Sequence, residues 1–176
     1  MSTGRTNLGG KTNSGRFFED FQIGETIAHA TPRTVGEGER ALYIALTGSL
    51  FALASSAEFA RRLKLPDAPL DDVLVFNLVF GRSVPDVSLN AIANLGYADG
   101  RFGMAVYPGD TLSATSRVIG LKENSNRETG VVYVQTTGLN QRGETVLDYV
   151  RWVMVRKRDE AAPAPGDHVP RLPTAV

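Results

Sequence analysis

Hydrophobic residues fill nearly every position of residues 73–80, "VLVFNLVF", so periodicity alone does not distinguish a buried helix from a buried strand. The residues at both ends favour a helix. Asp71 and Asp72 suit a helix N-terminus, because carboxylates cap its free N–H groups and face the positive end of its dipole. Gly81 and Pro85 suit the helix end. Since a helix that is hydrophobic on every side is buried, the sequence predicts a central helix.

Two shorter helices are predicted upstream by the spacing Ser/Thr-x-x-Glu, in which the hydroxyl and the carboxylate each cap a backbone N–H group. Thr34 with Glu37 marks one start, and Ser55 with Glu58 marks the other. Residues 47–54, "TGSLFALA", are too apolar for an exposed loop and are expected to line a pocket. The apolar positions of the two helices are Ala41, Leu42, Ala45 and Leu46 in the first, and Phe59, Ala60 and Leu63 in the second.

Long β-rich runs follow the central helix, and short turns separate them. The turns "YPGD" and "NQRG" and the loop "NSNRE" indicate antiparallel hairpins. A further strand is expected within residues 25–35. The sequence therefore predicts an α+β fold, in which an antiparallel sheet wraps around the central helix. The predicted strands are residues 91–98, 111–123, 130–139 and 144–157.

Composition divides the chain of 176 residues into one domain and two tails. Residues 1–16 are rich in Gly, Ser, Thr and Asn, which is typical of a flexible segment. Residues 17–158 form the predicted domain. Residues 159–176 hold four of the nine prolines, so we expect an extended linker there.

The charge and the composition exclude several classes of protein. The formal net charge of zero argues against nucleic-acid and membrane-surface partners. The absence of cysteine excludes disulfides and thiolate chemistry. The N-terminal residues do not form a signal peptide, and no apolar run is long enough to span a bilayer. We therefore expect a cytoplasmic location.

The stretches "FFEDFQIGETI", "YIALTGS", "NLGYADGRFGMAVYPGDTL" and "GLNQRGETVLDYVRWVMV" occur in this order across residues 17–158. Together they resemble the MaoC-like dehydratases, which have the hot-dog fold. The resemblance is strongest to the N-terminal repeat of the mesaconyl-CoA hydratases, also called β-methylmalyl-CoA dehydratases. It implies reversible hydration of an enoyl-CoA, with no cofactor other than the CoA of the substrate.

The family's acid and base are absent at the matching positions. In active members an aspartate, an asparagine two residues later and a histidine five residues later follow "LTG", and the aspartate and histidine hold the reacting water. Here these positions are Ser49, Phe51 and Ala54. A serine hydroxyl with no neighbouring base does not deprotonate water near neutral pH. The resemblance thus implies a hydratase site from which the dyad has been removed.

The start of the central helix departs from the family as well. The resemblance places a backbone N–H there that polarises the thioester carbonyl, and the usual His-Gly entrance falls on Asp71 and Asp72. Carboxylates at this point oppose a developing oxyanion. They either complement the helix dipole or supply the base of a thioesterase.

Other polar residues are candidates for substrate binding, each with a simpler alternative. Asn77 in the central helix lines the acyl pocket or satisfies a nearby backbone group. Arg101 lies near the family's thioester-binding region. Lys122 and Arg127 flank a loop that contacts CoA phosphate or is an ordinary polar hairpin. His29 is interpreted as a half-buried strand histidine without a catalytic role.

Three functions follow from these observations. The first is the supporting half of a mesaconyl-CoA hydratase-type enzyme, with acid and base supplied by a second hot-dog domain. The second is a non-catalytic hot-dog that binds acyl-CoA or acts as a scaffold. The third is an acyl-CoA thioesterase that uses Asp71 or Asp72. Because a single hot-dog exposes its sheet edge and the open side of its helix, we expect a homodimer or pairing with a second hot-dog domain.

Overall fold

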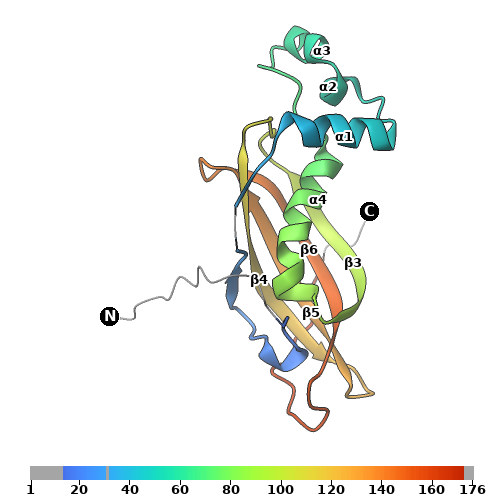
Figure 1. Ribbon diagram of the computed structural model, residues 1–176. Helices are drawn as coiled ribbons and strands as arrows, with labels where there is room; N and C mark the ends of the chain where they lie inside the picture. Colours follow the sequence, from blue (N-terminus) through green and yellow to red (C-terminus); the bar gives the residue numbers. More distant parts are fainter. Residues whose placement is uncertain (1–13, 31, 173–176) are drawn as a thin grey trace.

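The fold is a curved antiparallel sheet with one long helix against its concave face (Figure 1). The computed structural model describes residues 14–30 and 32–172. The strand order is β1-β4-β5-β6-β3, and β2 also pairs with β4. The predicted α+β architecture is therefore confirmed. The strands are β1 (Thr26–Ala28), β2 (Arg33–Thr34), β3 (Ala91–Phe102), β4 (Thr111–Glu123), β5 (Thr129–Leu139) and β6 (Thr145–Arg156).

The strand predictions are accurate where the turns are short and incomplete where the sheet is irregular. Strand β4 has the predicted bounds. Strand β3 runs past the predicted end at residue 98, because register shifts between Ala98 and Arg101 accommodate Asp99 at a positive φ of 51°. The strand predicted within residues 25–35 is two short strands, β1 and β2, both paired with β4.

Helix α4 (Asp72–Ser83) is the central helix, and it begins where predicted. The Asp71 carboxylate caps it by accepting a hydrogen bond of 2.9 Å from the backbone N–H of Val73. Val79 packs so closely on β5 that a Cβ at Gly138 would lie 2.6 Å from its Cγ2. The side of α4 away from the sheet is open, and Val73 is 55% exposed. The prediction that the helix is buried on every side is therefore wrong for this chain.

Three further helices lie beyond one end of the sheet, across the start of α4 (Figure 1). Gly36 caps the first, and its backbone N–H donates to Glu39 at 2.9 Å. Ser56 caps the third, where its Oγ accepts from the Phe59 N–H at 3.2 Å. The predicted helices exist, but the predicted caps at Thr34 and Ser55 are wrong by two residues and one residue. The helices are α1 (Glu37–Thr47), α2 (Ala52–Ser55) and α3 (Ala57–Arg62).

Residues 18–20 meet residues 158–159 at the other end of the sheet, where Glu19 accepts from the backbone N–H groups of Arg158 and Asp159. The short 3-10 helix η1 (Phe18–Asp20) inserts Phe18 into the core against Gly130 of β5. A π-helical turn, η2 (Val84–Ser88), continues α4 and leads into β3. Among residues 14–30 and 32–172, no helix combines the length and the apolar character needed to cross a membrane.

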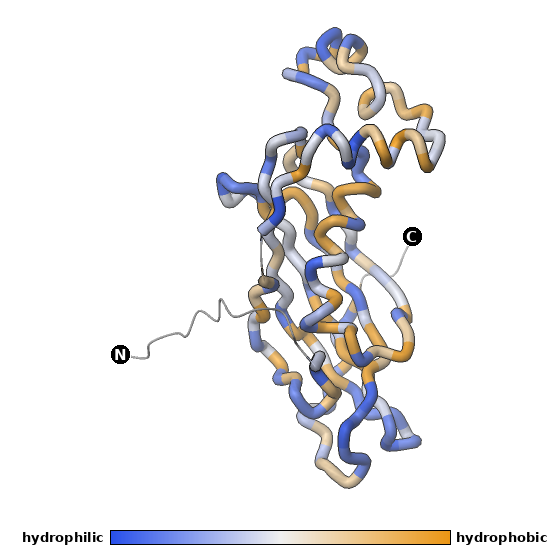
Figure 2. The backbone as a smooth tube through the Cα atoms, in the orientation of Figure 1, coloured by the Kyte–Doolittle hydropathy of each residue, from blue (hydrophilic) through white to orange (hydrophobic). Residues whose placement is uncertain are grey.

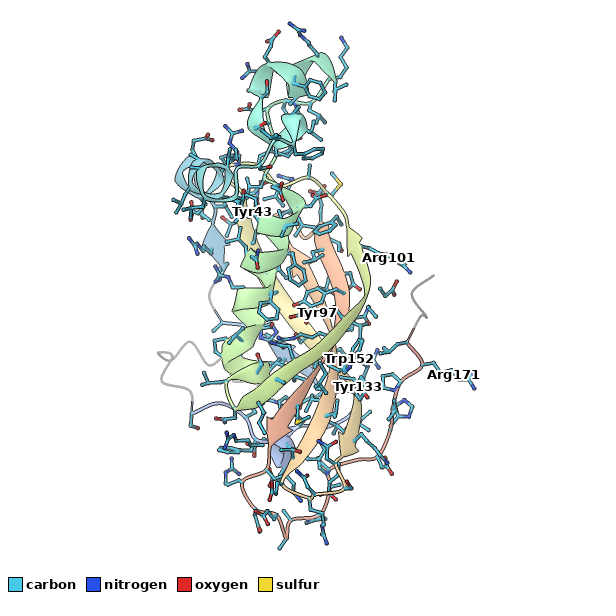
Figure 3. All side chains as sticks on the ribbon, turned by 90° about the vertical axis from the view of Figure 1, so that its right-hand side faces the viewer. Tyr43, Tyr97, Arg101, Tyr133, Trp152 and Arg171 are labelled. Carbon is cyan, nitrogen blue, oxygen red and sulfur yellow. The ribbon has the colours of Figure 1, made fainter. Side chains whose placement is uncertain are left out.

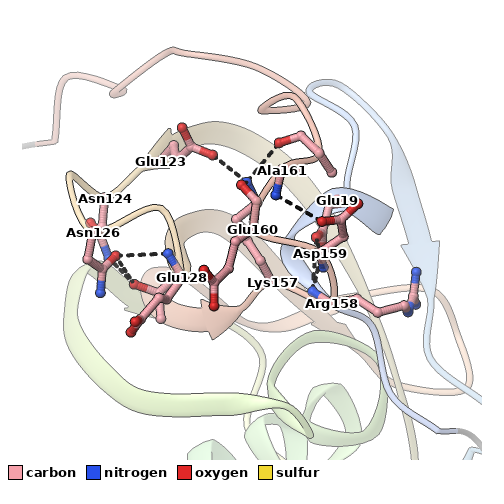
Figure 4. A network of polar contacts seen from close by, with 12 residues as sticks. Glu19, Glu123, Asn124, Asn126, Glu128, Lys157, Arg158, Asp159, Glu160 and Ala161 are labelled. Atoms are coloured by element: carbon pink, nitrogen blue, oxygen red, sulfur yellow. Dashed lines mark hydrogen bonds and ion pairs between the residues drawn. The ribbon is translucent and has the colours of Figure 1, made fainter.

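The C-terminal segment is extended and lies against the sheet. Lys157 at the end of β6 is fully buried and donates to the Glu123 carboxylate at 2.6 Å and to the carbonyls of Glu160 and Ala162 (Figure 4). Further on, His168 exchanges two backbone hydrogen bonds with Leu121 of β4. The predicted linker therefore contacts the domain through residue 168. The predicted flexible N-terminal tail falls mainly on residues 1–13, outside the described residues.

Candidate functional site

The two positions that the resemblance assigns to the dyad, Ser49 and Ala54, lie beyond the sheet, one between α1 and α2 and one in α2. Ser49 follows the left-handed Gly48 that ends α1, and its Oγ is 3.5 Å from the N–H of Phe51. Ala54 is a fully buried methyl group in α2. Neither side chain carries a titratable group, so this part of the chain holds no acid or base for water at these two positions.

Two carboxylates, of Asp71 and Asp72, and the phenol of Tyr43 lie close together at the start of α4. Tyr43 of α1 lies beside Asp71, and burial and this carboxylate raise the pKa of the phenol. Partial burial, followed by repulsion from Asp71, raises the pKa of the Asp72 carboxyl. Figure 3 shows Tyr43 above the first turn of α4. Since Asp71 is engaged as the helix cap, Asp72 is the carboxyl of this pair with the chemistry of a base.

An apolar cleft of about 190 Å³ lies between α4 and the edge strand β3. Phe76 of α4 forms its inner side, where its ring centroid is 5.6 Å from that of Tyr97 and 5.2 Å from that of Tyr149. Tyr97 points from β3 toward α4 (Figure 3). Most of the surface of the cleft is apolar, so the cleft suits a short hydrocarbon acyl group better than a charged group. The remaining lining residues are Ala98, Asp99, Gly100, Phe102 and Leu147.

A second cleft, of about 360 Å³, lies on the open side of α4 and is polar. It is lined in part by Arg33, Asn77 and Arg82. Burial and the neighbouring Arg33 lower the pKa of Arg82. Asn77 is exposed, and its Nδ2 donates to the Val73 carbonyl at 2.9 Å. Asn77 was expected in a buried position, and that expectation is wrong because the side of α4 that carries it is uncovered.

The candidate phosphate-binding residues do not lie together. Arg101 is at the end of β3 nearest α1 and pairs with Asp99 at 2.8 Å (Figure 3). Lys122 pairs with Asp167 at 2.8 Å near the opposite end of β4. A strand of this length spans about 40 Å at about 3.4 Å per residue, so Lys122 and Arg127 are far from the Ser49 and Ala54 region.

A buried polar network under α4 is a feature that the sequence analysis missed. His29 is buried outright rather than half-buried, with its Nδ1 2.9 Å from Asp86 Oδ2 and its Nε2 2.7 Å from Ser116 Oγ. The Ser116 hydroxyl continues the chain to Thr136 at 2.8 Å. Burial lowers the pKa of His29, and Asp86 offsets part of this effect. Ser116 is fully buried, so this Asp-His-Ser arrangement has no access to substrate and ties β4 and β5 to η2.

Arg151 of β6 is the second missed residue. It is fully buried, and its guanidinium lies 4.7 Å from the ring centroid of Phe80. The Nε of Arg151 and the hydroxyl of Tyr149 are buried without a hydrogen-bond partner among the described residues. Burial raises the pKa of Tyr149, and the charge of Arg151 offsets part of this effect. A charged residue among alternating apolar ones in "YVRWVMV" was the available signal.

Most of the large apolar side chains that are exposed belong to residues 42–63 and 89–104. Hydrophobic residues recur along α1 and α2, beyond the sheet, and along α4 (Figure 2). Leu46 is 77% exposed and Leu50 is 94% exposed. Monomeric proteins rarely expose so many large apolar side chains together, so this surface indicates an interface. Other members of this exposed set are Leu42, Phe51, Phe59, Leu63, Ile92, Leu95, Phe102 and Met104.

The antiparallel sheet and its central helix define a hot-dog protein of the MaoC-like class. A solved MaoC domain protein dehydratase from Chloroflexus aurantiacus J-10-fl is 65% identical, with a TM-score of 0.91 over 94% of this chain and 47% of that chain. A Mycobacterium tuberculosis protein described as having a double hotdog fold is 27% identical, with a TM-score of 0.82 over 90% of this chain and 50% of that chain. The predicted hot-dog fold is confirmed.

Residues 5–172 match the mesaconyl-CoA hydratase family, and the chain belongs to that family. The mesaconyl-CoA hydratase of Cereibacter sphaeroides is 67% identical over 166 residues, which cover 94% of this chain and 48% of that relative. The chain thus spans about half the length of the curated relatives it matches. The resemblance inferred from the sequence is therefore confirmed.

Proposed function

We propose that this chain is the hot-dog half that shapes the acyl-CoA cleft of an enzyme for reversible hydration of a branched dicarboxylic enoyl-CoA. A second hot-dog domain supplies the acid and the base. The observation that carries this proposal is the pair Ser49 and Ala54, which replaces the dyad in a chain that otherwise matches its family over residues 5–172.

The chemistry requires one group that deprotonates water and one that handles the proton at the α-carbon. The chain provides neither at the family positions, but its apolar cleft between α4 and β3 suits an acyl group. Its role in the reaction is therefore binding and orientation. CoA enters only as part of the substrate, and no other cofactor is proposed. The residues proposed to contact substrate are Phe51, Asp71, Asp72, Asn77 and Arg101, while Lys122 and Arg127 lie at the far end of the sheet.

The second hot-dog domain is proposed to cover the exposed apolar surface of α1, α2, α4 and β3. Each fully buried Leu or Phe side chain contributes about 1.5–3 kcal/mol, so this surface is sufficient for a stable pair. The half-length match to the relatives supports a second domain as the occupant. A homodimer of this chain is the competing arrangement. A cytoplasmic location remains a prediction of the sequence.

Complementation tests this function. The chain is mixed with the C-terminal half of the Cereibacter sphaeroides relative, and hydration of mesaconyl-CoA is followed by loss of the enoyl absorbance. We expect turnover from the mixture and a lower rate from the C-terminal half alone. Equal rates with and without this chain would contradict the supporting role. In that case the chain would be a scaffold or a separate acyl-CoA-binding protein.

A thioesterase is a second candidate, favoured by the raised pKa of Asp72 at the start of α4. Release of free CoA thiol from mesaconyl-CoA by this chain would support it, provided that Asp72→Asn abolishes the release. Asp67→Asn, at another exposed carboxylate in the loop before α4, is the matched control.

A further inference from the structure

Arg151 is a buried cation in the middle of the core. Its Nη2 donates to Ser83 Oγ at 2.9 Å, and its Nη1 is 3.4 Å from both Ser88 Oγ and Asn94 Oδ1. The guanidinium has five N–H donors, and only one of these contacts is short. The Nε donor of this side chain has no hydrogen-bond partner among the described residues, and the two contacts of Nη1 are long.

No carboxylate in the described part of the chain forms an ion pair with Arg151. The groups whose charge favours its protonated form are the phenols of Tyr149 and Tyr97, which are neutral at physiological pH, and burial lowers the pKa of the guanidinium. His29, whose pKa is lowered by burial and in part by the charge of Arg151, adds no negative charge. An unpaired charge in a protein interior is strongly unfavourable, so this arrangement lacks an anion.

The missing anion can approach from the apolar cleft. Tyr97 is the register partner of Arg151 on β3, and it also lines the cleft, as does Tyr149. The Tyr97 ring stands 6.1 Å from the ring of Phe80, over which the guanidinium lies. Tyr97 is 47% exposed, so the ring that stands between the cleft and Arg151 is not enclosed by the core on every side.

We propose that Arg151 binds the free carboxylate at the far end of a dicarboxylic acyl-CoA and thereby makes the cleft select dicarboxylic over monocarboxylic acyl groups. This inference rests on the proposed function, because it places the acyl chain in the cleft between α4 and β3. The planar guanidinium matches a carboxylate with two parallel hydrogen bonds, which gives both affinity and orientation. Arg151 is a specificity-determining residue here and takes no part in proton transfer.

The test compares two ligands that differ only in the carboxylate. Mesaconyl-CoA and tiglyl-CoA share the branched enoyl chain, and tiglyl-CoA has a methyl group in place of the free carboxylate. Calorimetry measures the Kd of both for the chain, alone and with the C-terminal half of the Cereibacter sphaeroides relative inactivated in its dyad. We expect mesaconyl-CoA to bind on the order of 100-fold more tightly, because a buried polar group left unpaired rejects the apolar analogue.

Two variants complete the test. Arg151→Met removes the charge at similar volume, and we expect it to bind the two ligands with equal Kd. Arg151→Lys keeps the charge but lacks the planar guanidinium with its two parallel N–H donors. We expect its preference for mesaconyl-CoA over tiglyl-CoA to lie between those of the wild type and Arg151→Met. Since replacement of an unpaired buried ion by an apolar side chain is often neutral or stabilising, thermal unfolding should show that Arg151→Met is folded.

Four results would contradict the inference. Equal Kd values for the two ligands in the wild type, or a preference that survives in Arg151→Met, would contradict the assignment of Arg151 alone. A loss of association with the C-terminal half in Arg151→Met, without any acyl-CoA present, would assign the missing anion to the partner domain. Failure of both ligands to bind under either condition would contradict the proposed function itself.

Discussion

His29 Nδ1 lies 2.9 Å from Asp86 Oδ2 across the interior, and this contact joins the segment after β1 to the π-helical turn after α4. The imidazole is buried, so the neutral form is favoured in the folded protein despite the adjacent carboxylate. The histidine is therefore a structural group whose charge state is coupled to folding.

The coupling predicts how stability depends on pH. The pKa of His29 is lowered below about 6.5 in the folded state, so its contribution is fully present above pH 6.5. As the pH falls below 6.5, the unfolded state takes up a proton that the folded state resists, and the free energy of unfolding decreases until the folded pKa is reached. Urea unfolding at pH 8, 7, 6 and 5 measures this slope.

Two variants test whether His29 causes this dependence of the free energy of unfolding on pH. His29→Gln should remove this part of the pH dependence and cost about 1–3 kcal/mol at pH 7.5 through the lost buried hydrogen bonds. His168→Gln changes the other histidine of the chain, in the exposed C-terminal segment, and should leave the slope intact. If both variants keep the full slope, carboxylates rather than His29 control it.

The C-terminal segment is predicted to depend on Lys157. Its ammonium is fully buried against Glu123 and two carbonyls of the segment, so Lys157→Ala leaves a carboxylate and two acceptors without their donor. We expect a loss of about 3 kcal/mol in the free energy of unfolding. Lys122→Ala removes an exposed pair with Asp167 on the same surface and should cost less than about 1 kcal/mol. Equal losses would show that burial of Lys157 is unimportant.

The exposed apolar surface predicts an interface variant that leaves the fold intact. Leu46 is 77% exposed, so Leu46→Asp should change the free energy of unfolding of the isolated chain by less than about 0.5 kcal/mol. It should weaken association with the second hot-dog half by tenfold or more, as measured by sedimentation. Val169→Asp, an exposed position in the C-terminal segment, is the matched control. Unchanged association in Leu46→Asp would place the interface elsewhere.

The elements were predictable from the sequence because their signals are local. The turns before and after β4 fix its bounds, and the carboxylate of Asp71 fixes the start of α4. The caps of α1 and α3 were misplaced because "GEGE" and "SSAE" offer overlapping capping patterns, and tertiary packing selects among them. The positive φ at Asp99, which extends β3 past a predicted turn, depends on pairing with β6.

Of the candidate site, only the lack of an acid and a base could be predicted from the sequence. The absence of acid and base at Ser49 and Ala54 remains a prediction of the sequence, whereas the burial of Arg151 and His29 depends on strands far apart in the chain. The open side of α4 could not be inferred from "VLVFNLVF", because a partner domain and the protein's own core favour the same apolar residues.

We expect that this chain alone does not hydrate an enoyl-CoA. A measurement of mesaconyl-CoA turnover by the isolated chain tests this most directly. Loss of the enoyl absorbance is followed at pH 7.5 with crotonyl-CoA as a second substrate. We expect no rate above that of buffer for either substrate. Turnover at an enzyme-like rate of about 1 per second or more would contradict this expectation and would require a base within the chain, with Asp72 the first to replace by asparagine.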